Sequence, residues 1–169
     1  KELSLEIFKE IGELGFLSVD VPEEYGGLAL DKTTSCIIVD ALSAGRNASI
    51  VVTASAHSGI GMLPIIWYGN ESQKKKYLPD LIKGNLIGCF GLTESISGSD
   101  PSLMKTNFVE VSDGYTLNGT KNWITNAPIA DVFIIWALDK EKKVHGFIVD
   151  KKTKGLTTSV IEKASLKIS

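Results

Sequence analysis

Two short segments of the chain carry side chains that could bind a flat ligand with a polar edge. The first, residues 88–101 (GCFGLTESISGSDP), runs from an apolar stretch into a loop rich in hydroxyls and glycine. Hydroxyls and free backbone N–H groups of such a loop can hydrogen-bond a heterocycle or an anionic group. A plain turn, with Ser99 or Asp100 capping the next element, explains the same composition and is favoured by it. The segment lacks the features of a P-loop and of a GxGxxG fingerprint.

The second segment, residues 119–126 (GTKNWITN), places an aromatic ring beside a hydroxyl. On a predicted strand, Trp123 and Thr125 lie on one face and Ile124 on the other, because successive side chains alternate. A large π-face next to a hydroxyl suits an aromatic cofactor with a polar edge. A core tryptophan beside an exposed threonine is the alternative, and for this strand by itself it is the better interpretation.

The remaining reactive side chains form no evident catalytic cluster. Glu94 and Asp100 could act as acid or base, but nothing in the sequence pairs them, and loop carboxylates are usually solvated. His57 stands in an apolar helical stretch, which indicates a hydrogen-bonded core histidine. The two histidines lie far apart and no CxxC occurs, so no zinc site is recognisable. Cys36 and Cys89 stand alone in apolar runs, and we expect two buried thiols of a reducing compartment.

The composition argues against nucleic-acid and membrane partners. The 169 residues include 18 Lys and Arg and 20 Asp and Glu, for a net charge of −2, whereas nucleic-acid binders carry clustered excess basic residues. Arg46 is the single arginine, which leaves little material for a bidentate clamp on phosphate or carboxylate. The longest apolar-rich run, residues 129–138, contains Asp131 and is too short to cross a membrane. The first residues lack the layout of a signal peptide.

The first half of the chain has the apolar period of helices, and Gly15 is expected to end the first of them. Asp31 or Thr33 should cap the second helix, and Asn70 or Ser72 the fourth. The third is apolar nearly all round, so we expect it to be buried. The predicted helices cover residues 3–14, 33–44, 48–67 and 70–82.

After residue 85 the apolar period changes to two, which is typical of strands. Asp113-Gly114 offers a turn, and Asn118-Gly119 predicts a tight hairpin because both residues accept positive φ. The predicted strands of an antiparallel meander cover residues 87–92, 107–111, 115–117, 121–125, 132–138 and 144–150, with an extended stretch at 157–161. Helices first and strands second give an α+β chain, with an all-helical domain over residues 1–86 and a β-domain over residues 87–169.

Taken together, these segments resemble the acyl-CoA dehydrogenases. The resemblance covers essentially the whole chain, and several weak signals that agree in order and spacing outweigh the alternative given above for each segment. The matching stretches are residues 22–27 (PEEYGG), 68–79 (YGNESQKKKYLP) followed by Lys83-Gly84, 90–100 (FGLTESISGSD) and 117–126 (LNGTKNWITN).

The resemblance implies a flavoenzyme with FAD as cofactor and an acyl-CoA thioester as substrate. Family members remove a proton from the α-carbon and a hydride from the β-carbon, transfer the hydride to flavin N5, and pass electrons singly to an electron-transfer flavoprotein. Their fold is an N-terminal helical domain, an antiparallel, barrel-like middle β-domain and a C-terminal helical bundle, assembled as homodimers or homotetramers. Such enzymes are cytoplasmic in prokaryotes or lie in the mitochondrial matrix.

The resemblance also assigns roles to residues of both candidate segments. Phe90 and Thr93 would meet the isoalloxazine, with Thr93 hydrogen-bonding its pyrimidine edge, and Ser99 would reach both FAD and the substrate. Trp123 would pack beside the ring, and Thr125 would place a donor near N5 and O4. The expected cofactor-binding residues are Phe90, Gly91, Leu92, Thr93, Glu94, Ser99, Trp123, Ile124 and Thr125, on two adjacent strands that form the wall behind the flavin.

The chain departs from the family's pattern in its sequence and its extent. Ser95 stands where proline is usual, which loosens the turn. Several motifs look most like glutaryl-CoA dehydrogenases, which grip the distal carboxylate with an arginine of the third helix, but Val51 and Val52 stand in that region. A dicarboxyl substrate would bury an unpaired charge, so we expect a neutral short or medium acyl chain. The family's catalytic glutamate lies in the C-terminal bundle, and we expect this polypeptide to lack it, to be inactive alone and to bind FAD poorly.

Two kinds of alternative remain. Acyl-CoA oxidases and flavin monooxygenases share this fold, and the sequence does not separate electron acceptors. A non-catalytic acyl- or partner-binding scaffold is the other alternative. The retained Thr93, Ser99, Trp123 and Thr125 argue against it, because a scaffold has no reason to keep a flavin wall.

Overall fold

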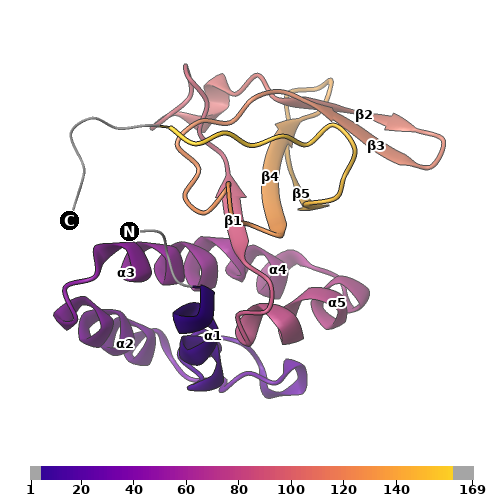
Figure 1. Ribbon diagram of the computed structural model, residues 1–169. Helices are drawn as coiled ribbons and strands as arrows, with labels where there is room; N and C mark the ends of the chain where they lie inside the picture. The colour runs from indigo at the N-terminus through magenta and orange to yellow at the C-terminus, as the bar shows by residue number, and fades with distance from the viewer. Residues whose placement is uncertain (1–4, 162–169) are drawn as a thin grey trace.

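The computed structural model describes residues 5–161, which form a helical layer and a sheet layer (Figure 1). In Figure 1 the helices lie below, and β1 rises from the helical layer into the sheet. This order confirms the α+β class. The helices are α1 (Leu5–Glu13), α2 (Lys32–Ala44), α3 (Ala48–Ser55), α4 (Leu63–Tyr68) and α5 (Glu71–Ile82), and the strands are β1 (Gly88–Gly91), β2 (Asn107–Val111), β3 (Gly114–Asn118), β4 (Val132–Leu138) and β5 (Val144–Asp150).

Several helix ends agree with the predicted capping residues. The Asp31 carboxylate accepts a hydrogen bond from the Thr34 amide at 2.9 Å and begins α2. Asn70 and Gln73 form a reciprocal capping box at the start of α5. Gly15, at φ +82°, follows the last turn of α1. Because these acceptors satisfy amides that have no partner within the first turn, the local sequence determines these boundaries.

The third predicted helix is present, but a π-helical turn, Ala56–Gly61, separates α3 from α4. The whole run, Ala48–Tyr68, has 21 residues and by length and composition alone could cross a membrane. The expectation that residues 129–138 are the longest apolar run is therefore wrong. One third (33%) of the most apolar window of this run is buried, including Met62 and Ile65, which are each 1% exposed in the core shared with α5.

Some apolar residues that the helical period places in buried stripes are exposed instead. Val52 and Trp67 of the Ala48–Tyr68 run are 52% and 60% exposed, so the expected burial of this helix all round is wrong. In α1, Phe8 and Ile11 are buried as predicted, whereas Leu14 beyond its end is exposed. α1 and α5 each bury one face, whereas α2 has no buried residue.

The sheet is mixed rather than an antiparallel meander. β2 pairs with β3 and β4 with β5 in antiparallel fashion, but β1 runs parallel to β4, with Gly88 opposite Val132. β2 also meets the end of β4 in parallel, with Asn107 opposite Leu138. The strand order β1-β4-β2-β3, with β5 on β4, leaves the sheet open over the described residues. Parallel pairs join strands distant in sequence, which a local apolar pattern does not reveal.

The predicted strand at residues 121–125 does not form, and neither does the hairpin at residues 118–119. After β3 the chain leaves the sheet and returns only at β4. Trp123 and Asn126 have φ of +62° and +69°, in the left-handed region that a strand excludes. Residues 157–161 are not in a strand either, and the rest of the expected β-domain lies outside the described residues.

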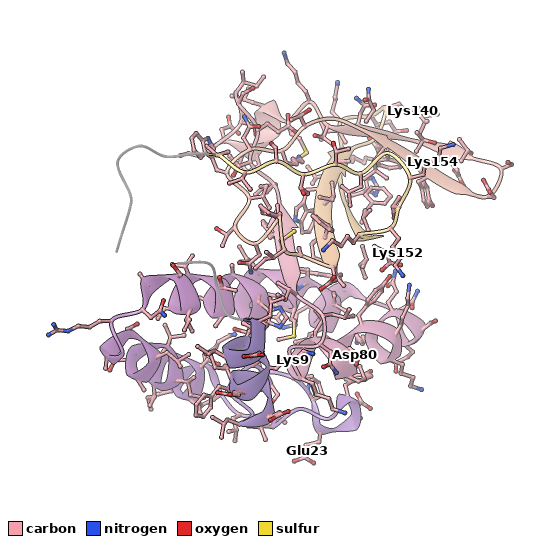
Figure 2. All side chains as sticks on the ribbon, in the orientation of Figure 1. Lys9, Glu23, Asp80, Lys140, Lys152 and Lys154 are labelled. Atoms are coloured by element: carbon pink, nitrogen blue, oxygen red, sulfur yellow. The ribbon has the colours of Figure 1, made fainter. Side chains whose placement is uncertain are left out.

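Alternate residues of β4 pack on opposite faces of the sheet. Val132 and Ile134 face the helical layer, where they share a cluster with Leu78 of α5. Phe133 packs with Cys89 on the other face. The six labelled charged residues of Figure 2 lie on the exterior of both layers and are exposed. The core cluster between the layers is apolar, and the buried polar residues include Thr53, His57 and Asn126.

Candidate functional site

Two hydrogen bonds hold the two candidate segments side by side. Neither of them belongs to a strand ladder. The amide of Asn122 donates a hydrogen bond to the Thr93 carbonyl at 2.9 Å. The Lys121 ammonium donates to the Leu92 carbonyl at 3.0 Å. The loop after β3 is thus attached to the end of β1, so the predicted adjacency is confirmed and the predicted strand is not.

A buried ion pair holds the same junction. The Lys121 Nζ lies 2.8 Å from Glu94 Oε1, and the two side chains are only 8% and 6% exposed. The Glu94 carboxylate also accepts the amides of Lys105 at 2.8 Å and Thr106 at 3.0 Å. Each carboxylate oxygen therefore has at least one donor, which satisfies the buried charge. The expectation of a solvated, unpaired Glu94 is wrong.

The pKa of Glu94 shows how strongly this junction favours the carboxylate. Burial by itself would raise the pKa, but the hydrogen bonds from Lys121 and from the amides of Lys105 and Thr106 lower it to about 2. Burial lowers the pKa of Lys121, and the Glu94 carboxylate opposes that effect. Because its oxygens are engaged within the protein, Glu94 supports the loop and does not present a charge to a ligand.

The residues of the first segment point in different directions. The Phe90 ring lies 5.9 Å from the Trp136 ring and packs toward the helical layer. Gly91 lies against Ile135, where a Cβ would come within 2.7 Å of the Ile135 side chain. Ser99 is exposed in the loop beyond β1. The structure therefore brings Leu92 and Thr93, at the end of β1, to the second segment, and it places Phe90 on the helical side.

The second segment presents its ring and its hydroxyl outward. Trp123 is 61% exposed and sits in the left-handed conformation. Ile124 packs with Cys89 and Phe133 on the sheet face away from the helices. Thr125 is exposed. Ile124 is more buried than Trp123 and Thr125, but a turn rather than a strand produces this difference. All three residues line one cavity, so the predicted alternation between two faces of a strand is wrong.

A large open cavity of about 1000 Å³ covers this face of the sheet. Trp123, Ile124 and Thr125 line it together with Phe133 and Phe147. The lining includes none of the first-segment residues from Phe90 to Ser99. The cavity therefore adjoins only one of the two candidate segments.

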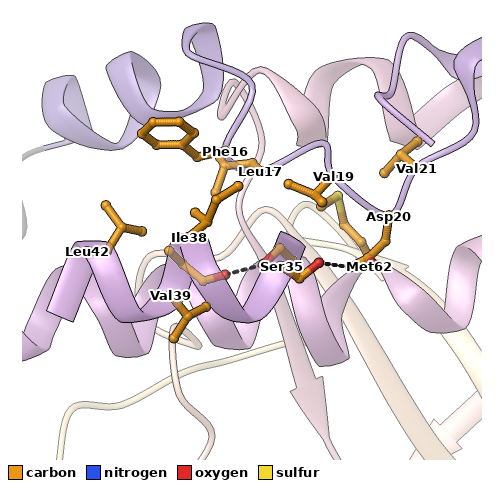
Figure 3. A pocket seen from close by; sticks show the side chains of 12 residues that line it. Phe16, Leu17, Val19, Asp20, Val21, Ser35, Ile38, Val39, Leu42 and Met62 are labelled. Atoms are coloured by element: carbon orange, nitrogen blue, oxygen red, sulfur yellow. Dashed lines mark hydrogen bonds between the residues drawn. The ribbon is translucent and has the colours of Figure 1, made fainter. Parts of the chain in front are cut away.

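A second pocket, in the helical layer, is far smaller. Figure 3 shows it between the chain before α2 and the α2 residues Ser35, Ile38 and Leu42. Its volume of about 30 Å³ has room for one or two water molecules. Ser35 closes one side by donating a hydrogen bond to Asp20 at 3.1 Å. This pocket is too small for the expected ligands.

Asn126 and His57 are buried polar residues that support the junction, and the first was missed from the sequence. The Asn126 amide donates to the carbonyls of Thr53 at 3.1 Å and Gly88 at 3.2 Å. His57 is fully buried and hydrogen-bonded, as predicted for a core histidine. Burial lowers its pKa to about 4, against a smaller opposing effect of the Leu81 carbonyl. Asn accepts left-handed φ more readily than most residues, which is the one local signal for the role of Asn126.

The other predicted features have mixed outcomes. Asp100 caps the short Pro101–Leu103 turn, accepting the Ser102 amide at 2.9 Å. Cys89 is buried as predicted, and burial raises the pKa of its thiol to about 12. Cys36 is exposed on α2, so the expectation of two buried thiols is wrong for it. Among residues 5–161 no cluster of His, Cys, Asp and Glu could hold a metal ion.

The arrangement fits the ring of a flavin. Among the described residues, no hydrogen bond engages the hydroxyl of Thr93 or Thr125, and neither side chain is buried. Both hydroxyls can therefore donate to a ligand, and the exposed Trp123 ring offers an apolar face nearby. Neighbouring segments thus supply the donors and the aromatic surface that a heterocycle with a polar edge requires.

Comparisons with known proteins give a consistent assignment. The family model described as acyl-CoA dehydrogenase, N-terminal domain, matches residues 1–85, and the one described as its middle domain matches residues 89–167. A probable acyl-CoA dehydrogenase of Bacillus subtilis is 48% identical over 164 residues, which are 96% of this chain and 27% of that protein.

Solved structures agree with the family models. The FAD complex of an acyl-CoA dehydrogenase from Bacillus anthracis superposes with a TM-score of 0.88 at 48% identity, covering 94% of this chain and 27% of that one. Glutaryl-CoA dehydrogenase from Mycobacterium smegmatis gives 0.89 at 38% identity, covering 95% and 41%. The chain therefore spans less than half the length of these relatives.

Proposed function

Because this chain belongs to the acyl-CoA dehydrogenase family, we propose that it supplies the helical and middle parts of an FAD-dependent acyl-CoA dehydrogenase. The observation that carries this proposal is the junction of the two candidate segments, where Asn122 donates to the Thr93 carbonyl. This contact attaches the end of β1, with Thr93, to the segment that carries Thr125 and the exposed Trp123 ring. FAD bound there supplies an acceptor, flavin N5, for the hydride from the β-carbon of an acyl-CoA thioester.

The side chains of the junction have distinct proposed roles. Thr93 and Thr125 donate hydrogen bonds to the polar edge of the flavin ring, and Trp123 covers the ring. Ser99, exposed beyond β1, reaches both the cofactor and the acyl-CoA. Donors fixed in advance where negative charge develops lower the barrier, because they need not reorganise during the reaction. Leu92 and Ile124 complete the proposed wall, and Phe90, Gly91 and Glu94 support it from behind, because Phe90 packs toward the helical layer, Gly91 packs against Ile135, and Glu94 is paired with Lys121.

In our proposal, none of these residues is the base that removes the α-proton. The family resemblance assigns it to a glutamate of a C-terminal helical bundle, and this chain spans 27% and 41% of the two solved relatives. We assign residues 1–86 to the N-terminal helical domain and residues 87–169 to the middle domain. The 169-residue polypeptide alone is expected to be inactive and to retain little FAD after gel filtration. Retained flavin that an acyl-CoA bleaches would contradict this.

The proposed electron acceptor is an electron-transfer flavoprotein, and the proposed assembly is a homodimer or homotetramer in the cytoplasm or the mitochondrial matrix. The test is turnover of butyryl-CoA by the full-length enzyme, followed both as reduction of an electron-transfer flavoprotein and as oxygen consumption. The proposal requires the first signal. Rapid oxygen consumption without it would instead identify an acyl-CoA oxidase.

A neutral acyl chain is the proposed substrate. The Ala48–Tyr68 run holds no Lys or Arg. Its one histidine, His57, is buried and neutral. Val52, in the region where glutaryl-CoA dehydrogenases carry arginine, is 52% exposed. A glutaryl carboxylate would have no cation from this run, and leaving it unpaired on desolvation costs about 2–5 kcal/mol.

The expected result is a higher kcat/KM for butyryl-CoA than for glutaryl-CoA, by at least tenfold, in the full-length enzyme. Steady-state kinetics with both substrates measure the ratio. A control variant, Val52→Arg, should lower the ratio of kcat/KM for butyryl-CoA to kcat/KM for glutaryl-CoA, because it places a cation at this position. A wild-type enzyme that turns over glutaryl-CoA faster would overturn the assignment.

A further inference from the structure

Gly88, the first residue of β1, is held by side chains from both layers. Its amide donates a hydrogen bond to His57 Nδ1 at 2.9 Å. Its carbonyl accepts a hydrogen bond from Asn126 Nδ2 at 3.2 Å. Both side chains are buried, at 0% and 8% exposure. β1 therefore enters the sheet with its first peptide groups fixed by two groups that lie 31 and 38 residues away.

His57 can make its two contacts in one protonation state only. Its Nε2 lies 3.0 Å from the carbonyl of Leu81, which only accepts, so Nε2 carries the proton. Nδ1 is then the acceptor for the Gly88 amide. The ring is further fixed by an edge contact with Phe8, with centroids 5.0 Å apart. His57 thus connects the end of α5 to the start of β1 as a neutral, rigid spacer.

Asn126 makes the corresponding connection from the second candidate segment. It directly follows Trp123, Ile124 and Thr125 and has a φ of +69°. Its side-chain amide also donates a hydrogen bond to the carbonyl of Thr53 at 3.1 Å. Thr53 follows Val51 and Val52, the residues we place near the end of the acyl chain. One side-chain amide therefore connects the proposed flavin loop to the proposed acyl-contacting helix.

The backbones of the π-helical turn and β1 approach closely at two glycines. A Cβ on Gly61 would come within 3.1 Å of the carbonyl carbon of Gly88, whereas a Cβ on Gly88 would make an ordinary contact of 3.5 Å with the Gly61 Cα. The hydrogen bond of His57 aligns this turn with β1, and those of Asn126 align β1 with α3.

We propose that Asn126 and His57 are positioning residues that fix the flavin-facing segments relative to the acyl-contacting helix. This rests on the proposed dehydrogenase function. Hydride transfer needs reacting atoms held about 3–3.5 Å apart, and small displacements of either partner slow it strongly. Loss of the Asn126 bridge is therefore expected to slow reduction of bound flavin more than it weakens binding of the acyl-CoA.

The test uses Asn126→Asp in the full-length, FAD-loaded enzyme. Aspartate keeps the size and tolerates the left-handed φ, but it presents oxygens to the carbonyls of Thr53 and Gly88 and so breaks both bonds. The matched control is Asn107→Asp, because Asn107 also donates to a backbone carbonyl, that of Lys105 at 3.1 Å, but is exposed. Asn126→Gly removes the donor without adding charge. This variant replaces Asn126→Asp in the test if the aspartate variant does not fold.

Stopped-flow reduction by butyryl-CoA should fall at least tenfold at saturating substrate in the Asn126 variant, with KM changed less than kcat. The visible absorption band of the bound flavin should shift, while the control remains like the wild type. His57→Gln, which keeps a donor and an acceptor, should retain more activity than His57→Phe. An Asn126 variant that loses thermal stability but reduces its flavin at the wild-type rate would overturn the proposal. Failure of the wild type to reduce flavin would instead reject the dehydrogenase function.

Discussion

Lys121 reaches Glu94 across 27 residues of chain and closes the junction of the two candidate segments. Such a contact has no local sequence signal, because neither residue stands in a helix or a regular strand. The sequence identified Glu94 as a candidate but left it without a partner. The structure supplies that partner and the amides of Lys105 and Thr106, and thereby changes Glu94 from a candidate acid or base into a support for the site.

Lys121→Met should destabilise the protein by about 3 kcal/mol, because removing one partner of a buried pair leaves the other charge uncompensated. The matched control is Lys143→Met, since Lys143 pairs with Glu141 at 2.8 Å while both side chains are mostly exposed. That change should cost less than about 1 kcal/mol. Denaturant unfolding of the full-length variants measures both values. Equal losses for the two variants would contradict the account of the ion pair.

His57 predicts a pH dependence of stability. Its pKa falls from 6.5 to about 4 in the folded protein, so its contribution is fully present above pH 6.5 and is lost as pH falls through about 4. Between these two pH values the unfolded state binds a proton on His57, whereas the buried ring of the folded state does not. The loss by pH 4 is on the order of 3 kcal/mol.

Thermal unfolding of the full-length protein between pH 7 and pH 4 measures this effect. The His57→Gln variant should show a smaller decline than the wild type, because glutamine has no titrating group. Replacement of the exposed His145 by Gln is the comparison for a histidine on the surface. A decline of the same size in wild type and His57→Gln would show that other groups control the pH response.

At the scale of elements, the outcome of prediction depended on whether the determining contacts are local. α2 and α5 begin where Asp31 and Asn70 cap them, and the burial of Tyr77 and Leu81 on α5 follows the helical period. The strand predicted at residues 121–125 failed, because distant contacts hold that segment in a turn. The parallel pairing of β1 with β4 was missed for the same reason.

Alanine substitutions at two helical glycines distinguish the effect of packing on stability from the effect of helix propensity. A Cβ on Gly12 of α1 would come within 2.5 Å of the Lys83 carbonyl group at the end of α5, whereas a Cβ on Gly59 has nothing within 4 Å. Gly12→Ala should therefore cost about 1–3 kcal/mol through the backbone shift it forces. Gly59→Ala should be neutral or stabilise by about 0.5–1 kcal/mol.

Differences in unfolding midpoint between these variants and the wild type check the packing of α1 against α5. A Gly12→Ala variant as stable as Gly59→Ala would mean that the two helices do not approach as closely as the structure has them.

At the scale of the whole molecule, β1 is the element that joins the two layers. It pairs with β4 in the sheet while Gly88 bonds to His57 in the helical layer. Lys76 of α5 adds a link to Asp150 of β5 at 2.9 Å. The sequence predicted the order of the layers and the adjacency of the two candidate segments, and the roles of the residues in these segments stay predictions. The buried links between the layers required the structure, because they join residues 31 to 73 positions apart.

We propose that these layers carry the flavin wall of an acyl-CoA dehydrogenase. Anaerobic addition of butyryl-CoA to the full-length protein loaded with FAD, followed by absorbance of the flavin near its visible maximum, tests this proposal. The band should bleach as the acyl-CoA is added, and the thioester product should be α,β-unsaturated. FAD that binds in stoichiometric amount but keeps its full absorbance with short and medium neutral acyl-CoA substrates would contradict it.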